Sequence, residues 1–116
     1  AHGPEELGLC YDSGHGNLTP RGLSRAVGLD ELDGMADRLI ALHLHDNDGT
    51  ADQHRIPFTG TVDWPRLCRI VARSNYRKCV SMESNVHREE TQDPVEFLRR
   101  AHAAGSRLQA MVNAAR

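Results

Sequence analysis

Three short apolar runs, each ending in a polar cluster, alternate along this chain with segments of helical periodicity. The apolar runs cover residues 7–11, 39–45 and 78–83. The helical segments cover residues 18–39, 64–74 and 94–114, with breaks expected near Gly28 and Gly105. Strands that alternate with helices need crossover connections, so the order β-α-β-α-β-α predicts an α/β fold with three parallel strands.

Four polar residues are candidate helix caps. Asp63 and Asp93 each stand before a helical segment, with a proline within the next two residues. A side-chain oxygen at such a position can accept from the first free amides, and proline is tolerated in the first turn. Asn17 or Thr19 could begin the first helical segment in the same way.

The size and composition of the chain exclude several classes of protein. With 116 residues, 39% of them hydrophobic and 26% charged, the chain fits a single domain over residues 1–116. The sequence has neither an apolar run of ~20 residues nor the basic start of a signal peptide, so we expect a cytoplasmic protein without membrane contact. A net charge of −2 gives no bulk attraction for nucleic acid, which we do not expect as a partner.

An ionisable residue ends each predicted strand: Asp12, His43 and Glu83. Taken alone, each is also explained as a turn residue or a half-buried side chain. Because parallel strands bring their carboxyl ends to one edge of the sheet, ~5–10 Å apart, we expect the three side chains to converge. Two carboxylates and an imidazole that meet there are costly without a partner, and a divalent cation is the simplest partner.

A second group of candidate ligands lies in the loops. The chain has seven histidines, an unusually large number. His15 follows Asp12 by three residues, and Asp52 and His54 form an Asp-x-His pair after the second predicted strand. Imidazole and carboxylate together suit zinc, manganese or iron. The alternative is that these loop residues are simply solvated.

Four motifs, in order along the chain, resemble those of a known family. They are Leu-Cys-Tyr-Asp-Ser-Gly-His-Gly-Asn at 9–17, Leu-His-Leu-His-Asp-Asn-Asp-Gly at 42–49, Asp-Gln-His-Arg-Ile-Pro-Phe-Thr-Gly-Thr-Val-Asp-Trp at 52–64 and Ser-Met-Glu-Ser-Asn at 81–85. They resemble the carboxyl-terminal part of the xylose isomerase-like TIM barrels, a superfamily of sugar phosphate isomerases and epimerases that also contains nucleases of the endonuclease IV type. The resemblance implies a partial (β/α)8 barrel whose three βα units correspond to strands 6–8.

The resemblance also implies roles for the residues at the strand ends. Asp12, His43 and Glu83 match three ligands of the family's central metal, while the fourth, a glutamate on strand five, has no counterpart here. His43 and His45 have the same strand parity, and either could be the ligand. We expect His43 to bind the metal and His45 to contact the substrate or support the ligands.

The loop residues match the family in two ways. In endonuclease-like members the positions of His15, Asp52 and His54 bind a further zinc, whereas in epimerase-like members the position of His15 binds substrate. Arg55 is a candidate for binding a sugar hydroxyl or phosphate, and a solvated loop cation is the alternative.

The implied function is that of a metal-dependent sugar or sugar phosphate isomerase or epimerase, or the carboxyl-terminal fragment of one. A divalent cation, Mn, Mg, Co or Zn, would hold the substrate carbonyl while Glu83 transfers the neighbouring proton, with His15 as a second catalytic candidate. The alternatives are an endonuclease IV-like zinc-dependent abasic-site nuclease and a non-catalytic half-barrel.

The length of the chain bears on each of these functions. A (β/α)8 barrel needs ~250 residues, so 116 residues supply under half of one. Three parallel strands would leave two open sheet edges. We therefore expect a homo-oligomer or a missing amino-terminal barrel half, and an isolated chain without catalytic activity. The expected partner is a small-molecule sugar or sugar phosphate.

Overall fold

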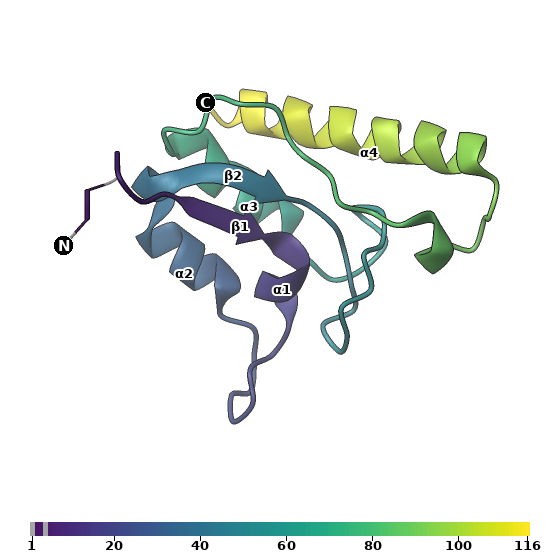
Figure 1. The fold of residues 1–116 in the computed structure, drawn as a ribbon, viewed down its shortest axis with the longest axis horizontal. Coiled ribbons are helices and arrows are strands. Elements are labelled where there is room, and N and C mark those ends of the chain that lie inside the picture. Colours follow the sequence, from purple (N-terminus) through teal and green to yellow (C-terminus); the bar gives the residue numbers. More distant parts are fainter. Residues whose placement is uncertain (1, 4) are drawn as a thin grey trace.

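The computed structural model describes residues 2–3 and 5–116, a mixed α/β chain with one small parallel sheet (Figure 1). Its strands are β1 (Leu9–Asp12) and β2 (Leu39–His43). Its helices are α1 (Ser13–Asn17), α2 (Gly28–Gly34), α3 (Trp64–Arg73) and α4 (Pro94–Ala114). The described part of the chain also contains two short 3-10 helices, η1 (Ala36–Arg38) and η2 (Val86–Arg88).

β1 and β2 pair in parallel, as the alternation of strands and helices predicted. Asp12 and His43 are partners in this register, so the last residues of the two strands lie side by side. Tyr11 and Leu42, one residue earlier, belong to the hydrophobic core, where they join buried side chains of α3 and α4. Because successive side chains of a strand point to opposite faces, the ionisable strand ends face away from this core.

The third predicted strand forms only in part. Residues 78–83 form one isolated parallel bridge, between Met82 and Leu44, the residue that follows β2. The Leu44 N–H donates to the carbonyl of Ser81 at 2.9 Å, and the N–H of Glu83 donates to the Leu44 carbonyl at 3.0 Å. The parallel direction is as predicted, but the prediction of a full strand was wrong. In the described structure this segment has a neighbouring strand on one side only, which gives it half of the ladder contacts of a central strand.

The first helical segment also differs from its prediction. Helix was expected over residues 18–39 with a break near Gly28. Residues 18–27 instead form an irregular loop, and α2 begins at Gly28. Gly22 in this loop has φ +86°, a left-handed conformation that interrupts a helix. The predicted cap of this segment was wrong as well. Asp12 instead caps the short α1, where a loop was expected, and its Oδ1 accepts the His15 N–H at 2.9 Å.

α3 and α4 begin where they were predicted to begin. The side chains of Asp63 and Asp93 each accept a backbone N–H of the following helix at 2.9 Å, so both caps are confirmed. The predicted break at Gly105 was wrong, because α4 continues through it. A Cβ there would lie 2.9 Å from the sulfur of Met82, so this glycine allows close packing instead. Among the described residues, none of the helices combines the length and the apolar character needed to cross a membrane.

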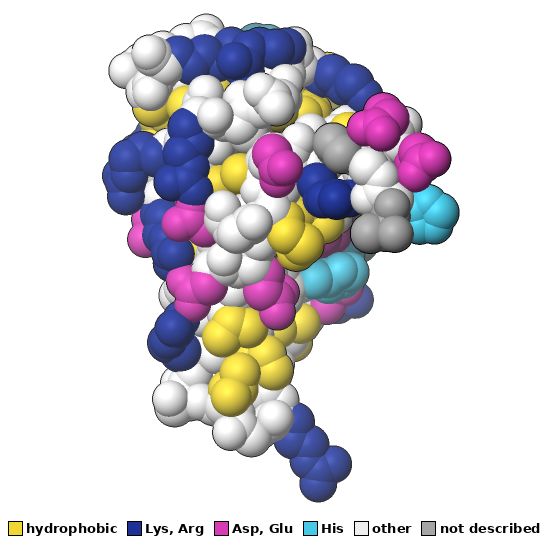
Figure 2. Space-filling view, turned by 90° about the vertical axis from the view of Figure 1, so that its left-hand side faces the viewer, with side chains coloured by type: hydrophobic (Ala, Val, Ile, Leu, Met, Phe, Trp, Pro, Cys, Tyr) yellow, Lys and Arg dark blue, Asp and Glu magenta, His cyan; other side chains and the backbone are white. Residues whose placement is uncertain are grey.

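Figure 2 views the molecule from the amino ends of β1 and β2, where hydrophobic side chains are exposed among charged side chains of both signs. Three large hydrophobic residues that precede or begin the strands are exposed: Leu7 (60%), Met35 (41%) and Ile40 (48%). A group of exposed apolar side chains is typical of a surface that makes further contacts.

Asp30 of α2 forms ion pairs with Arg66 of α3 and with Arg25. These ion pairs make the stability of the fold depend on pH in the acid range. The Asp30 carboxylate accepts from Arg66 at 2.7 Å and from Arg25 at 2.6 Å, and the hydrogen bonds from Arg66 and Arg25 lower its pKa below 3.8. A depressed pKa contributes stability that is present above the unfolded-state pKa and lost as the pH falls through the folded-state value. We expect Asp30→Asn to lower the melting temperature at neutral pH, with the difference from wild type vanishing in acid. A difference that stays the same at every pH would contradict this role.

Candidate metal centre

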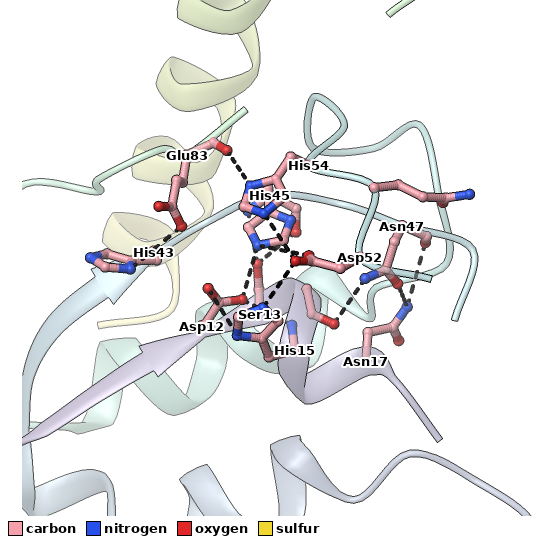
Figure 3. Close-up of polar contacts among 12 residues, drawn as sticks. Asp12, Ser13, His15, Asn17, His43, His45, Asn47, Asp52, His54 and Glu83 are labelled. Carbon is pink, nitrogen blue, oxygen red and sulfur yellow. Dashed lines mark hydrogen bonds and ion pairs between the residues drawn. The ribbon is translucent and has the colours of Figure 1, made fainter. Parts of the chain in front are cut away.

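The three ionisable residues at the predicted strand ends lie together (Figure 3). Asp12, His43 and Glu83 each offer one ligand atom, and these atoms all lie within 4.8 Å of one another. Nδ1 of His43 lies 3.5 Å from Oε2 of Glu83, and both side chains are about half exposed (50% and 48%). The predicted convergence is confirmed, and the exposure of two members leaves the group accessible from solvent.

His45 adjoins this group and is completely buried. Its Nε2 lies 3.0 Å from Oδ1 of Asp12 and 4.0 Å from Oδ1 of Asp52, yet neither ring nitrogen has a hydrogen-bond partner within the described residues. A buried polar group without a partner is costly. We expected His45 to contact substrate or support the ligands. The ring has no exposed surface for a substrate in this structure, and its contact with Asp12 agrees with a role in supporting the ligands.

The loop residues predicted as a second ligand set also meet. Oδ2 of Asp52 lies 3.2 Å from Nε2 of His15 and 3.2 Å from Nε2 of His54. His45 stacks on His54, with the ring centroids 3.9 Å apart. His45, Asp52 and His54 form a second group whose ligand atoms lie within 4.8 Å of one another. The sequence predicted His15, Asp52 and His54 for this group. In the structure His45 is its third member, and His15 contacts Asp52 without belonging to the group.

The charges of the loop residues shift one another's pKa. Partial burial opposes a lower pKa for Asp52, but the hydrogen bond from His15 and the positive charges of His54 and His15 outweigh it, so this pKa is lowered. The pKa of His54 is raised, mainly because the Glu83 carbonyl accepts from its Nδ1–H at 2.9 Å. Desolvation opposes this rise, and the charge of Asp52 adds to it. A histidine whose Nδ1–H is tied to a carbonyl has its Nε2 oriented for a ligand.

Buried polar residues that the sequence analysis missed hold these loops in place. Oγ of Ser13 donates to the carbonyl of His45 at 2.7 Å and accepts the His45 N–H at 2.9 Å. The side chain of Asn47 donates to the Gly14 carbonyl and accepts from Asn17, both at 2.8 Å. Gly14 packs so closely on the His45 ring that a Cβ there would overlap it. The sequence signalled only turn-forming character at these positions.

Arg55 directly follows His54 in the same loop. Its main chain pairs with that of Asp46 in an isolated antiparallel bridge, with N–H to carbonyl distances of 2.8 and 2.9 Å. The bridge sets the position of Arg55 beside the candidate site. Its role as a substrate contact stays a prediction.

Comparison with known proteins gives this geometry a context. The model of the xylose isomerase-like TIM barrel family matches residues 1–101. The chain belongs to this family. It is 40% identical over 110 residues to an uncharacterized protein, y4fM, of Sinorhizobium fredii (strain NBRC 101917 / NGR234). That match covers 95% of this chain and 33% of the relative, so the chain spans about a third of the relative's length. No solved structure matches the chain.

The xylose isomerase-like TIM barrel family accounts for the position of the site. Sites of TIM barrels lie at the carboxyl ends of the strands. Asp12 and His43 end β1 and β2, and Glu83 follows the bridge that joins residues 78–83 to β2. The described sheet therefore fits a part of such a barrel, with the candidate ligands at its functional edge.

The residues of this xylose isomerase-like chain fit a divalent metal. Imidazole nitrogens and carboxylate oxygens are the donors that zinc, manganese and related cations take. Within the described residues the ring nitrogens of His45 make no hydrogen bond, and Nε2 faces Oδ1 of Asp12 and Oδ1 of Asp52, which favours a cation beside it. The hydrogen bond from Nδ1 of His54 to the Glu83 carbonyl is a second observation in favour of a cation, because it orients Nε2 as a ligand.

Proposed function

We propose that this chain is part of a metal-dependent isomerase or epimerase of sugars or sugar phosphates. The observation that carries the proposal is the meeting of Asp12, His43 and Glu83 at the carboxyl edge of the sheet, within 4.8 Å. Membership of the xylose isomerase-like family supports it. The half-exposed side chains of His43 and Glu83 give a small polar substrate access to the group.

The chain's own residues supply the donors for the cofactor. Asp12, His43 and Glu83 would hold a divalent cation, Mn, Mg, Co or Zn, and His45 with Asp52 and His54 offers a further set of donors beside them. A bound divalent cation supplies Lewis acidity, which eases removal of a proton next to a carbonyl.

Glu83 is the proposed proton-transfer residue. Its carboxylate is half exposed and can accept a proton from the carbon beside a substrate carbonyl and return it to the neighbouring carbon. His15 is the second catalytic candidate. Its side chain is 60% exposed and its ring is held by Asp52 at 3.2 Å, so it can bind a substrate oxygen or carry a second proton. Arg55 is the proposed contact for a hydroxyl or phosphate.

Exchange of a substrate carbon-bound proton with solvent tests this function directly. The full-length protein, loaded with Mn, Mg, Co or Zn, is incubated in deuterated water with a panel of aldoses, ketoses and their phosphates, and exchange beside the carbonyl is followed by NMR. We expect exchange with at least one sugar, and Glu83→Gln to slow it ~10²- to 10⁴-fold. Glu90→Gln, an exposed glutamate outside the site, is the matched control. Absence of exchange with every sugar and metal would refute the proposal.

A second candidate function rests on the loop group. Oδ2 of Asp52 lies 3.2 Å from Nε2 of His15 and from Nε2 of His54. By resemblance, these three residues match the ligands of a further zinc in the endonuclease-like members of the family. Cleavage of an oligonucleotide with an abasic site, without proton exchange on any sugar, would favour this nuclease. Failure of both assays in a metal-loaded protein would favour the non-catalytic half-barrel.

The proposed activity belongs to a protein larger than the described sheet. The chain spans about a third of the relative's length, and the exposed Leu7, Met35 and Ile40 lie before or at the start of the strands. We infer that further βα units, or another copy of the chain, cover the sheet edges and complete the site.

A further inference from the structure

Glu89 has an almost completely buried side chain within an otherwise exposed charged stretch. It follows η2, in the sequence Arg88-Glu89-Glu90. Its side chain is only 5% exposed, whereas Arg88 and Glu90 are exposed. An ionisable side chain loses hydration when it is buried, so its position requires specific partners.

Both carboxylate oxygens of Glu89 face partners from distant parts of the chain. Oε1 accepts the backbone N–H of Ile56 at 2.7 Å, and Oε2 lies 3.6 Å from the guanidinium of Arg100 on α4. Ile56 is two residues after His54. The Glu89 side chain therefore connects the loop that carries the candidate ligands to α4. Figure 1 shows α4 beside the segment of chain that leads into this helix.

The backbone around His54 needs such support. His54 has φ +49°, a conformation that is unfavourable for a non-glycine residue and persists only where surrounding contacts impose it. Its carbonyl accepts the Asn85 N–H at 2.8 Å, and its Nδ1 donates to the Glu83 carbonyl at 2.9 Å. These bonds join the two loops to each other, and among the described contacts Glu89 joins them to Arg100 of α4.

We propose that Glu89 is a positioning residue that clamps residues 52–56 against α4 and so holds Asp52 and His54 in their places in the metal centre. This inference rests on the proposed function insofar as it concerns metal binding. Without the carboxylate, the Ile56 N–H loses its acceptor and Arg100 loses its partner. The loop then has fewer contacts that impose the left-handed backbone at His54.

Two measurements on the full-length protein test the clamp. The first is amide hydrogen exchange of residues 52–56, which reports the order of the loop without any metal. The second is titration with Co²⁺ alone, followed by visible absorption. We expect Glu89→Ala to speed exchange in residues 52–56 and to weaken Co²⁺ binding ~10- to 100-fold, as loss of a residue that orients ligands does.

Conservative and neighbouring variants separate positioning from a loss of charge. Glu89→Gln keeps an oxygen for the Ile56 N–H, so we expect it to restore most of the Co²⁺ affinity. Arg100→Ala keeps that bond and removes only the ion pair, so a smaller loss is expected. Glu90→Ala removes an exposed charge next to Glu89 and should leave both measurements unchanged.

The results for the Glu89 and Arg100 variants either support or overturn the clamp. Wild-type exchange and wild-type Co²⁺ affinity in Glu89→Ala would overturn it. If Glu89→Ala does not fold, Arg100→Ala decides: faster exchange confined to residues 52–56 supports the clamp, and unchanged exchange overturns it. If the wild type binds no Co²⁺ while Glu89→Ala still loosens residues 52–56, the clamp stands and the proposed metal-dependent function fails.

Discussion

Replacing Asp46 by alanine is expected to lower the free energy of unfolding by about 4 kcal/mol, since each buried donor left without an acceptor costs ~1–3 kcal/mol and water can replace part of the loss. Asp46 is fully buried, and its carboxylate accepts four hydrogen bonds. The donors are the backbone N–H groups of Asn47 (2.9 Å), Phe58 (2.9 Å) and Val62 (3.2 Å) and the indole N–H of Trp64 (2.8 Å). Urea unfolding followed by circular dichroism measures the loss.

Asp48→Ala is the matched control for this prediction. Asp48 lies two residues further along the same loop and is exposed, and its hydrogen bonds stay within residues 48–53. We expect this variant to lose much less stability than Asp46→Ala, as is usual for exposed polar contacts. Equal losses in the two variants would show that the buried carboxylate has no special role.

Replacing Asp12 by asparagine is expected to abolish stabilisation by a divalent metal. The amide keeps an oxygen for the His15 N–H that caps α1, but the charge beside His43, His45 and Glu83 is lost. A metal present at 100 times its Kd raises the free energy of unfolding by about 2.7 kcal/mol. We expect the wild type to show a rise of this size with Zn²⁺ or Co²⁺, and Asp12→Asn to show none. Melting temperature against metal concentration is the measurement.

The control for this experiment is Asp37→Asn, the same substitution at an exposed aspartate of η1. It should keep the full response to metal. A metal-dependent rise in Asp12→Asn that matches the wild type would remove Asp12 from the ligand set and, with it, the proposed centre at the strand ends.

Much of the site could be predicted because parallel strands obey simple geometry. Asp12 and His43 end short apolar runs, and any parallel pairing of those runs brings their last residues to one edge. The Asp-x-His pair at Asp52 and His54 was recognisable by spacing and by family resemblance. The helix caps Asp63 and Asp93 were predictable because a cap acts only on the turn that follows it.

The remaining features depend on contacts between distant segments. Ser13, Asp46 and Asn47 are small polar residues after strands, and nothing in their local sequence distinguishes a solvated turn from a buried one. Glu89 and Glu90 are chemically identical neighbours, but only Glu89 faces Ile56 and Arg100. Strand formation over residues 78–83 likewise depends on which segments lie on both sides.

The parallel pairing of the first two strands, the caps of α3 and α4 and the identity of the residues at the strand ends follow from the amino-acid sequence, because periodicity and capping act over a few neighbouring residues. Burial of His45, Asp46 and Glu89, and the choice of His45 as the neighbour of Asp52 and His54, were decided only by the tertiary structure. The desolvation of a side chain depends on the atoms that all other segments of the chain place around it, and a short stretch of sequence does not contain that information.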